Sequence, residues 1–256
     1  MRKRQKLVTS AIFLSLGLLL IQNVNLELRY LLIAVMSGLS WILAAWSLKE
    51  GLSGVEWLTV TLPSVTFTTA VGLFYILLPP ALWARLIIAL VFGIGEYALL
   101  LTANIFSVAA IRTIALFRAA TAVGFVMTLV TGFFLFDTIF SFRLSFWATG
   151  LAVASVSFLF FLPSYWSVEL KPKISKSIVN YSLWSALCLG FLAMTICFWP
   201  ISISVSSLFV STMLYVFLGI FQHHFVQRLF TRTLWEYLTV GLVVTITTLL
   251  TAGWGV

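Results

Sequence analysis

The sequence predicts an all-α fold, a polytopic transmembrane helix bundle with about nine spans, and three observations predict it. Hydrophobic residues make up 62% of the 256 and charged residues only 9%, which is too few charges to cover the surface of a soluble domain. Apolar runs of about 20 residues recur along the chain, and this is the length that a helix needs to cross a bilayer. The basic residues lie mainly at the ends of these runs.

A closed β-barrel is the other fold that can span a membrane, because hydrocarbon leaves no partner for an unpaired backbone polar group. Barrel strands have about ten residues of alternating polarity. The apolar runs of this chain are continuous and twice as long. We therefore expect helices, arranged as a single transmembrane domain over residues 1–256.

The expected spans cover residues 7–22, 30–48, 57–78, 82–103, 119–140, 145–162, 178–198, 204–225 and 234–254. Four basic residues between positions 2 and 6 precede the first span. No small-residue cleavage site follows that span, so it is expected to be an uncleaved signal anchor.

Prolines and one arginine set the boundaries of several expected helices. The pair Pro79-Pro80 is expected to end the third helix, and Pro200 the seventh, because proline cannot continue a helix. Pro163 is expected to begin a polar connection after the sixth helix. Residues 105–117 are apolar but interrupted by Arg112, which predicts an interfacial helix or a re-entrant turn.

Charge placement predicts the topology, with a cytoplasmic N-terminus and, after nine spans, a C-terminus outside. Only Arg29, Arg85 and Arg143 then fall outside, which leaves twelve of the fifteen basic residues on the cytoplasmic side, as the positive-inside rule requires. Tryptophans gather at the two expected interfaces, where their rings are most stable: Trp46, Trp57, Trp166, Trp235, Trp83, Trp147, Trp199 and Trp254. The predicted location is the cell (cytoplasmic) membrane.

Glu96 is the most informative residue, because it lies inside the fourth span. An ionised carboxylate facing lipid there is disfavoured by about 3 kcal/mol or more, so Glu96 must face the interior, pair with a cation or carry a proton. The functional interpretation is a site for ion coupling or a counter-charge for a substrate. The structural interpretation is a buried ion pair with Arg112 or Arg118. These arginines could instead bind lipid phosphates, and Asn104 could bond a neighbouring helix or cap its own.

Other polar residues carry weaker signals. Arg85, Asp137 and Arg143 form a possible charge group on the outer face, with solvated helix ends as the simpler interpretation. His223 and His224 are adjacent, so they point in different directions on a helix and make a poor metal site. The sequence predicts no catalytic residue, no metal, no cofactor and no nucleic-acid partner, since the net charge of +8 follows from the positive-inside pattern.

Small residues recur every four positions in the fifth span, at Ala120, Gly124, Thr128 and Gly132. Such a stripe lets helices approach closely in lipid, where van der Waals contact drives association. We expect this helix to be central to the bundle, with a homodimer interface as the alternative.

Pro63 is expected to kink the third span. Hydroxyl residues surround it, and they could satisfy the carbonyls that proline leaves free or line a polar path: Thr59, Thr61, Ser64, Thr66, Thr68 and Thr69.

One stretch of the chain resembles a known group of proteins. The residues concerned lie between Gly95 and Phe140 and include Glu96-Tyr97, Asn104-Ile105-Phe106 and Arg118-Ala119-Ala120. They resemble uncharacterised multi-pass membrane proteins of ultrasmall bacteria of the candidate phyla. The resemblance implies a bacterial cytoplasmic membrane and brings no activity with it.

Three functions fit these features. Short loops and the small-residue stripe favour a non-catalytic scaffold or accessory subunit, with the lipid bilayer, other membrane proteins or a second copy of the chain as partners. Glu96 and the hydroxyl residues around Pro63 favour a small permease or an ion-coupled transporter. A lipid-processing enzyme could use the inner arginines, but no nucleophile or base is evident beside them, so an enzyme is not the expectation.

Overall fold

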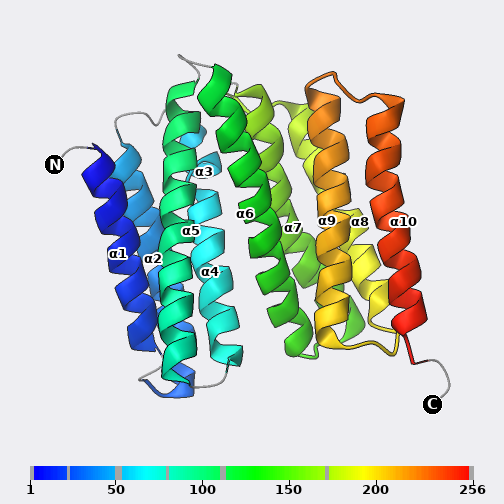
Figure 1. The fold of residues 1–256 in the computed structure, drawn as a ribbon, viewed down its shortest axis with the longest axis horizontal. Helices are drawn as coiled ribbons and strands as arrows, with labels where there is room; N and C mark the ends of the chain where they lie inside the picture. Colours follow the sequence, from blue (N-terminus) through cyan, green and yellow to red (C-terminus); the bar gives the residue numbers. More distant parts are fainter. Residues whose placement is uncertain are drawn as a thin grey trace. The chain divides into compact units, whose positions relative to one another are not determined.

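A computed structural model gives the fold of the chain (Figure 1). The residues that it describes are 3–21, 24–49, 54–78, 81–109, 114–170 and 173–253. All regular elements within these ranges are helices, and nine helical segments among them are long and apolar enough to cross a membrane. The predicted fold class, an all-α bundle of about nine spans, is confirmed.

The helices are α1 (Lys3–Ile21), α2 (Leu26–Leu48), α3 (Glu56–Thr59), α4 (Leu62–Leu77), α5 (Leu82–Ala109), α6 (Ile114–Ser141), α7 (Phe146–Glu169), α8 (Lys176–Ile196), α9 (Ile203–Phe225) and α10 (Thr231–Thr251). They form two compact units, Met1–Thr131 and Gly132–Val256. The first unit therefore contains α1 to α5 and the first part of α6, and the second unit contains the rest.

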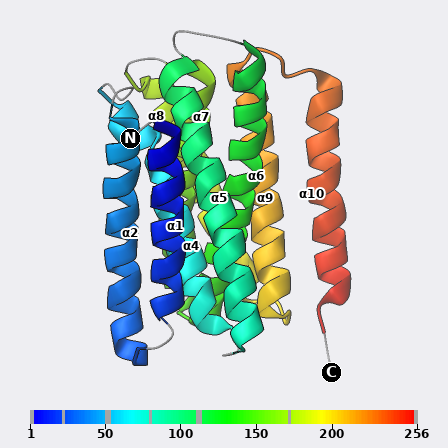
Figure 2. The ribbon, with the colours of Figure 1, turned by 60° about the vertical axis from the view of Figure 1, so that its left-hand side comes forward.

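In the first unit, α1 packs against α2 and α5, and α4 packs against α2 and α5. Figures 1 and 2 both show α1 directly beside α5. The serine Oγ of Ser15 on α1 donates a hydrogen bond of 2.6 Å to the main-chain oxygen of Ala89 on α5. This arrangement places α2, α4 and α5 around a common interior.

The third span consists of two helices, α3 and α4, separated by Val60 and Thr61. Pro63 lies in the first turn of α4, where its missing N–H would have no partner within the helix anyway. The helix is thus interrupted just before the proline, while the backbone of Val60 and Thr61 stays in the right-handed helical region. The kink at Pro63 stays a prediction.

The prediction of a separate interfacial or re-entrant segment at residues 105–117 is wrong for the described residues. Residues 105–109 belong to α5, which continues to Ala109, and residues 114–117 belong to α6, which begins at Ile114. Each of these helices has 28 residues, about 42 Å at 1.5 Å per residue. They exceed the hydrocarbon thickness of about 30 Å, so their ends extend toward the headgroups. Arg112 lies outside the described residues.

The prediction that Pro163 ends the sixth helix is also wrong. Pro163 lies inside α7, which continues to Glu169 and ends at Leu170 with a left-handed φ of 47°. Proline is tolerated inside membrane helices where neighbouring groups satisfy the carbonyl that it leaves free. The helix therefore contains residues 163–169 of the segment, residues 163–177, that the sequence assigned to a polar connection.

In the second unit, α7 packs very closely against α8, and α9 contacts α7, α8 and α10. A Cβ atom at Gly190 would lie 2.7 Å from the main-chain oxygen of Gly150 and 2.8 Å from Cβ of Ala154. Small residues therefore allow this contact, as they do at other close helix pairs in lipid. A network of contacting aromatic rings lies beside it and extends from buried Phe161 and Tyr165 to exposed Tyr181; its members are Phe161, Tyr165, Tyr181, Phe217, Phe221 and Phe225.

Candidate functional site

The carboxyl group of Glu96 lies at the centre of a buried polar cluster in the first unit. Glu96 is on α5 and has no exposed surface. Its Oε1 atom accepts a hydrogen bond from Ser64 Oγ on α4 and one of 3.4 Å from Ser40 Oγ on α2. The two serine Oγ atoms are 2.8 Å apart. Three helices therefore meet at one carboxyl group through hydroxyl groups.

Thr68 lies one turn after Ser64 on α4 and completes the cluster. Its side chain is 2% exposed, and its hydroxyl lies near the Glu96 carboxyl group. Oγ1 of Thr68 and Oε2 of Glu96 nevertheless have no hydrogen-bond partner of good geometry among the described residues. We name the four residues Ser40, Ser64, Thr68 and Glu96 the Glu96 cluster; it presents five side-chain oxygen atoms, two of them unpartnered.

A second pair of hydroxyl groups joins α2 to α4 beside the cluster. Ser37 Oγ lies 2.8 Å from Thr69 Oγ1. Each hydroxyl also lies 2.8 Å from the main-chain oxygen one turn earlier in its own helix, Ser37 from Ile33 and Thr69 from Val65. Because each hydroxyl has one proton, one of them donates across the contact while the other donates to its own helix. The α2–α4 contact is thus held by hydroxyl groups at two successive levels.

Helical spacing explains why these hydroxyl groups share one interior. Ser37, Ser40 and Ser47 are three and seven residues apart on α2, and Ser64 and Thr68 are four apart on α4, so each set lies on one helix face. The hydroxyl residues around Pro63 are evident in the sequence, whereas Ser40 lies on another helix and was not among the predicted site residues. The three-and-seven spacing of the α2 serines was the signal that could have revealed it.

Apolar packing closes the site on the side of α5. A Cβ atom at Gly95 would lie 2.7 Å from Cζ of Phe67 and 3.0 Å from Cε of Met127, so the glycine allows Phe67 to approach the backbone next to Glu96. Phe67 stacks on Phe92 with ring centroids 5.5 Å apart. These contacts exclude water from the carboxyl group.

An apolar groove of about 590 Å³ lies between α1 and α5, but it does not include the Glu96 cluster. Gly93 and Tyr97 line it from α5, together with aliphatic side chains of both helices. Glu96 points away from this groove toward α2 and α4. The structure therefore represents a state in which the carboxyl group is occluded.

The other members of the predicted Glu96 site do not join the cluster. Arg118 on α6 is exposed, and it forms no ion pair with Glu96 in the described part of the chain. Asn104 lies eight residues after Glu96, about 12 Å along α5, and its buried Oδ1 atom has no partner among the described residues. Arg112 is outside those residues. The described partners of Glu96 are all hydroxyl groups.

The residues of the predicted outer charge group belong to different units. Arg85 is half-buried in the first unit, and its buried Nε atom has no hydrogen-bond partner among the described residues. In the second unit, Asp137 Oδ1 accepts a hydrogen bond of 3.0 Å from Ser207 Oγ. Arg143 is exposed in the turn after α6, with a left-handed φ of 48°. The grouping of the three residues stays a prediction.

The small-residue stripe on α6 meets different helices along its length. Gly124 faces α5, where a Cβ atom would lie 3.6 Å from Cγ2 of Thr102. Gly132 faces α9, where a Cβ atom would lie 2.7 Å from Cδ2 of Leu214. Ala120 is buried, and Thr128 is half-buried with its Oγ1 atom bonded to the Gly124 main-chain oxygen at 2.8 Å. The closest approach is at Gly132.

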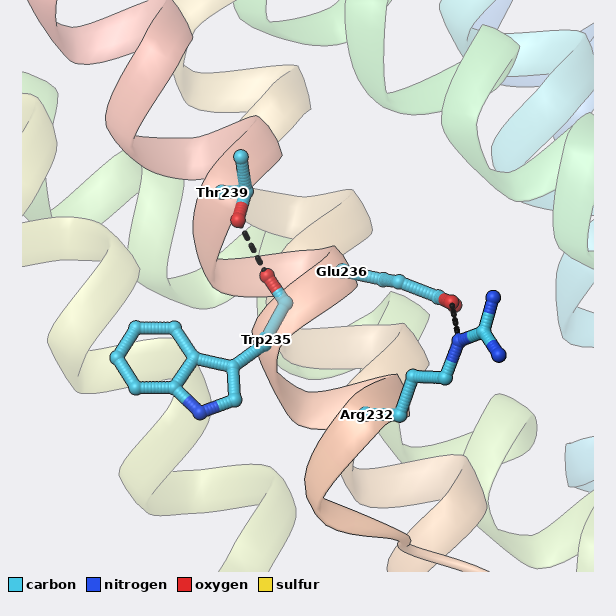
Figure 3. A network of polar contacts seen from close by, with 4 residues as sticks. All are labelled: Arg232, Trp235, Glu236 and Thr239. Atoms are coloured by element: carbon cyan, nitrogen blue, oxygen red, sulfur yellow. Dashed lines mark hydrogen bonds and ion pairs between the residues drawn. The ribbon is translucent and has the colours of Figure 1, made fainter.

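An exposed carboxylate of the same chain shows the contrast with Glu96. Glu236 on α10 pairs with Arg232 one turn earlier, at 3.4 Å, and both side chains are largely exposed (Figure 3). The neighbouring Thr239 donates a hydrogen bond of 2.6 Å to the main-chain oxygen of Trp235. Solvent and Arg232 both stabilise the charge of Glu236. Glu96 is buried, and it has no cationic partner among the described residues. No group of three or more His, Cys, Asp or Glu residues within the described ranges could hold a metal ion.

Together these features define a polytopic α-helical membrane protein with an occluded carboxyl site between three helices. Residues 52–251 match the model of a family described as protein of unknown function (DUF5656), and the chain belongs to this family. The matched region includes Ser64, Thr68 and Glu96, whereas Ser40 precedes it. No significant match was found among curated proteins or solved structures.

Proposed function

We propose that the protein is an ion-coupled membrane transporter and that Glu96 is its ion-coupling group. One observation carries the proposal: the carboxyl group of Glu96 is completely buried, and its partners among the described residues are all hydroxyl groups. A structural ion pair, the simpler interpretation of an intramembrane glutamate, has no support from Arg118.

Glu96 can couple ion binding to movement because a buried charge is costly. A carboxylate removed from water loses several kcal/mol of solvation that hydroxyl partners only partly replace. A bound proton or small cation neutralises the group, and its release restores the cost. The interior of α2, α4 and α5 therefore has different energies in the loaded and the empty state, and this difference is what couples ion binding to a conformational change.

The proposal is tested by reconstituting the full chain in liposomes on a solid-supported electrode and by jumping the pH or the concentration of Na⁺ or K⁺. Wild type is expected to give a transient charge displacement as an ion enters the buried site, and Glu96→Gln is expected to abolish it. This measurement needs no knowledge of the transported substrate.

Glu236→Gln is the matched control, because it makes the same substitution at the exposed carboxylate of Figure 3. It is expected to leave the charge displacement unchanged. A signal that persists in Glu96→Gln, or the absence of any signal in correctly inserted wild type, would contradict the proposed role.

The accessory-subunit function has its own support in α10. Only Gly241 and Thr248 of this helix are buried, and large apolar residues such as Leu242 and Leu250 are exposed. Such a surface suits contact with a helix of another membrane protein. Cysteine cross-linking from position 242 in native membranes is expected to give protein adducts under this alternative, and labelling by lipid probes alone would remove its support.

The proposed setting is the bacterial cytoplasmic membrane of ultrasmall candidate-phyla bacteria, with the N-terminus in the cytoplasm. The resemblance of residues 95–140 and the excess of basic residues on one side support it. A C-terminal alkaline phosphatase fusion is expected to be active and a C-terminal fluorescent fusion dark. The opposite pair of results would reverse the proposed topology.

A further inference from the structure

We infer that the coupling ion is sodium, bound without its water shell by the oxygen atoms of the Glu96 cluster. This inference rests on the proposed transport function and names the ion that the same site would take. The sodium ion is transported and released, so it is a substrate of the protein and not a permanently bound cofactor.

The ligand set points to a hard cation. The cluster brings together five side-chain oxygen atoms from α2, α4 and α5, and carboxylate and hydroxyl oxygens are the ligands that hard cations prefer. A proton needs only one acceptor atom. The two buried unpartnered atoms, Oε2 of Glu96 and Oγ1 of Thr68, belong to neighbouring residues, and a cation between them would bind both.

The charge of the cluster selects a monovalent cation. Glu96 is its single acid, so a monovalent ion gives a neutral site. A divalent ion would leave one unit of positive charge in an apolar interior formed by Phe67 and Phe92, and such a charge is costly to bury. Calcium and magnesium are therefore excluded by energy, although they accept the same kind of ligand.

The spacing of the oxygen atoms selects a small ion. Sodium has nearly the radius of calcium, whose bonds to oxygen are about 2.3–2.6 Å, so neighbouring ligands at right angles lie roughly 3.4 Å apart. Ser40 Oγ and Glu96 Oε1 are 3.4 Å apart, and the two serine Oγ atoms are 2.8 Å apart. Ser64 Oγ lies closer still to Glu96 Oε1, in direct hydrogen-bond contact. An entering ion must therefore separate these oxygen atoms, and potassium, which is larger, must separate them further than sodium.

Occlusion of the site favours an ion that sheds its water. The apolar wall at Gly95 and Phe67 leaves no room for a hydration shell, so the protein oxygens must replace it, as they do in selective cation sites. Ser64 lies about one turn, and Thr68 about two turns, after the break between α3 and α4. Movement of α4 at this break would open or close the cluster.

The test is the thermal unfolding of the full chain in detergent at constant ionic strength, with choline chloride replaced stepwise by NaCl, LiCl or KCl. A ligand that binds the folded state raises the melting temperature with its concentration. Sodium is expected to stabilise wild type with a half-saturating concentration at least about tenfold below that of potassium, a difference of about 1.4 kcal/mol. Binding of ²²Na⁺ to the same samples gives a second, direct readout.

Thr68→Val and Glu96→Gln are expected to abolish both the sodium-dependent shift and ²²Na⁺ binding. Thr66→Val is the matched control, because Thr66 is also buried on α4, but its hydroxyl bonds the Pro63 main-chain oxygen of its own helix. This control is expected to respond to sodium as wild type does.

Two results would overturn the inference. One is a wild type that binds no ²²Na⁺ and melts identically in sodium, potassium and choline. The other is a Thr68→Val protein that responds to sodium as wild type does. If the first result is accompanied by a charge displacement that depends on pH and on Glu96, the coupling ion is a proton and the transport function stands; the second result would mean that sodium binds outside the Glu96 cluster. Loss of that displacement as well would remove both proposals.

Discussion

The two units of the molecule place their most buried polar groups in different surroundings. In the first unit, hydroxyl groups from two helices converge on a buried carboxyl group, and two oxygen atoms of this cluster have no partner among the described residues. In the second unit, the buried Tyr165 hydroxyl lies 3.2 Å from Ser185 Oγ in a core of stacked aromatic rings. The comparison suggests that the second unit provides stability, while the first carries a site that can exist in more than one state.

The largest expected effect is a loss of stability in the second unit. Gly190→Leu places a side chain where even a Cβ atom would lie 2.7 Å from the Gly150 main-chain oxygen, so α7 and α8 must separate. We expect a loss of about 3 kcal/mol or more, measured by unfolding in SDS with tryptophan fluorescence. Gly38→Leu is the control, because nothing lies within 4 Å of its Cβ position. Equal losses in both variants would contradict the close α7–α8 contact.

A smaller effect is expected from removing one hydroxyl group of the Glu96 cluster. Ser64→Ala deletes a hydrogen bond to the carboxyl group of Glu96, and bonds to such groups contribute about 2 kcal/mol. Ser185→Ala makes the same substitution in the aromatic core, where an intramembrane hydrogen bond contributes about 0.6 kcal/mol. The same unfolding measurement compares them. If Ser185→Ala proves the more damaging, the contrast between the two units is wrong.

The sequence predicts the features that arise within one helix. It does not predict the contacts that form between helices. Apolar length within single segments predicted the nine spans, and the isolated acid drew attention to Glu96. The partners of Glu96 come from α2 and α4, and no pattern within one helix states which helices become neighbours. From the sequence alone, Arg118 was therefore as reasonable a partner for Glu96 as any hydroxyl residue, and Ser40 was not considered.

Some helix ends were predicted wrongly, because rules derived for soluble proteins were applied to helices that lie in a membrane. Pro163 was expected to end a helix, as it does in water, but within a packed membrane unit other groups can satisfy the freed carbonyl. Residues 105–109 were assigned to an interfacial segment because Arg112 follows them. These residues are apolar, which favours continuation of α5. Because α5 is longer than the hydrocarbon layer is thick, its last residues were predicted to form a separate element.

A mild effect is expected from Tyr165→Phe. The substitution removes the hydroxyl that bonds Ser185 Oγ and, at 3.4 Å, the Phe217 main-chain oxygen, but it keeps the ring and its stacking on Phe161. We expect a loss of about 0.6–1 kcal/mol by SDS unfolding. A loss of several kcal/mol would show that the polar contact, and not the aromatic packing, holds this core together.

The smallest effect is expected at the exposed ion pair of α10. Glu236→Gln removes the partner of Arg232 on a solvated face, and exposed pairs one turn apart contribute about 0.3–0.5 kcal/mol. The change should disappear at high salt because the charges are screened. A salt-independent loss above 1 kcal/mol would mean that this pair is less exposed than its geometry indicates.

Infrared difference spectroscopy tests the central claim most directly, namely that the buried carboxyl group of Glu96 changes its ionic state. Spectra of the reconstituted protein are compared between acidic and alkaline buffer, each with sodium and with choline, for wild type and Glu96→Gln. A carboxyl-stretch band that changes between conditions in wild type and is missing from the variant is the expected result. Identical difference spectra from the two proteins would contradict it.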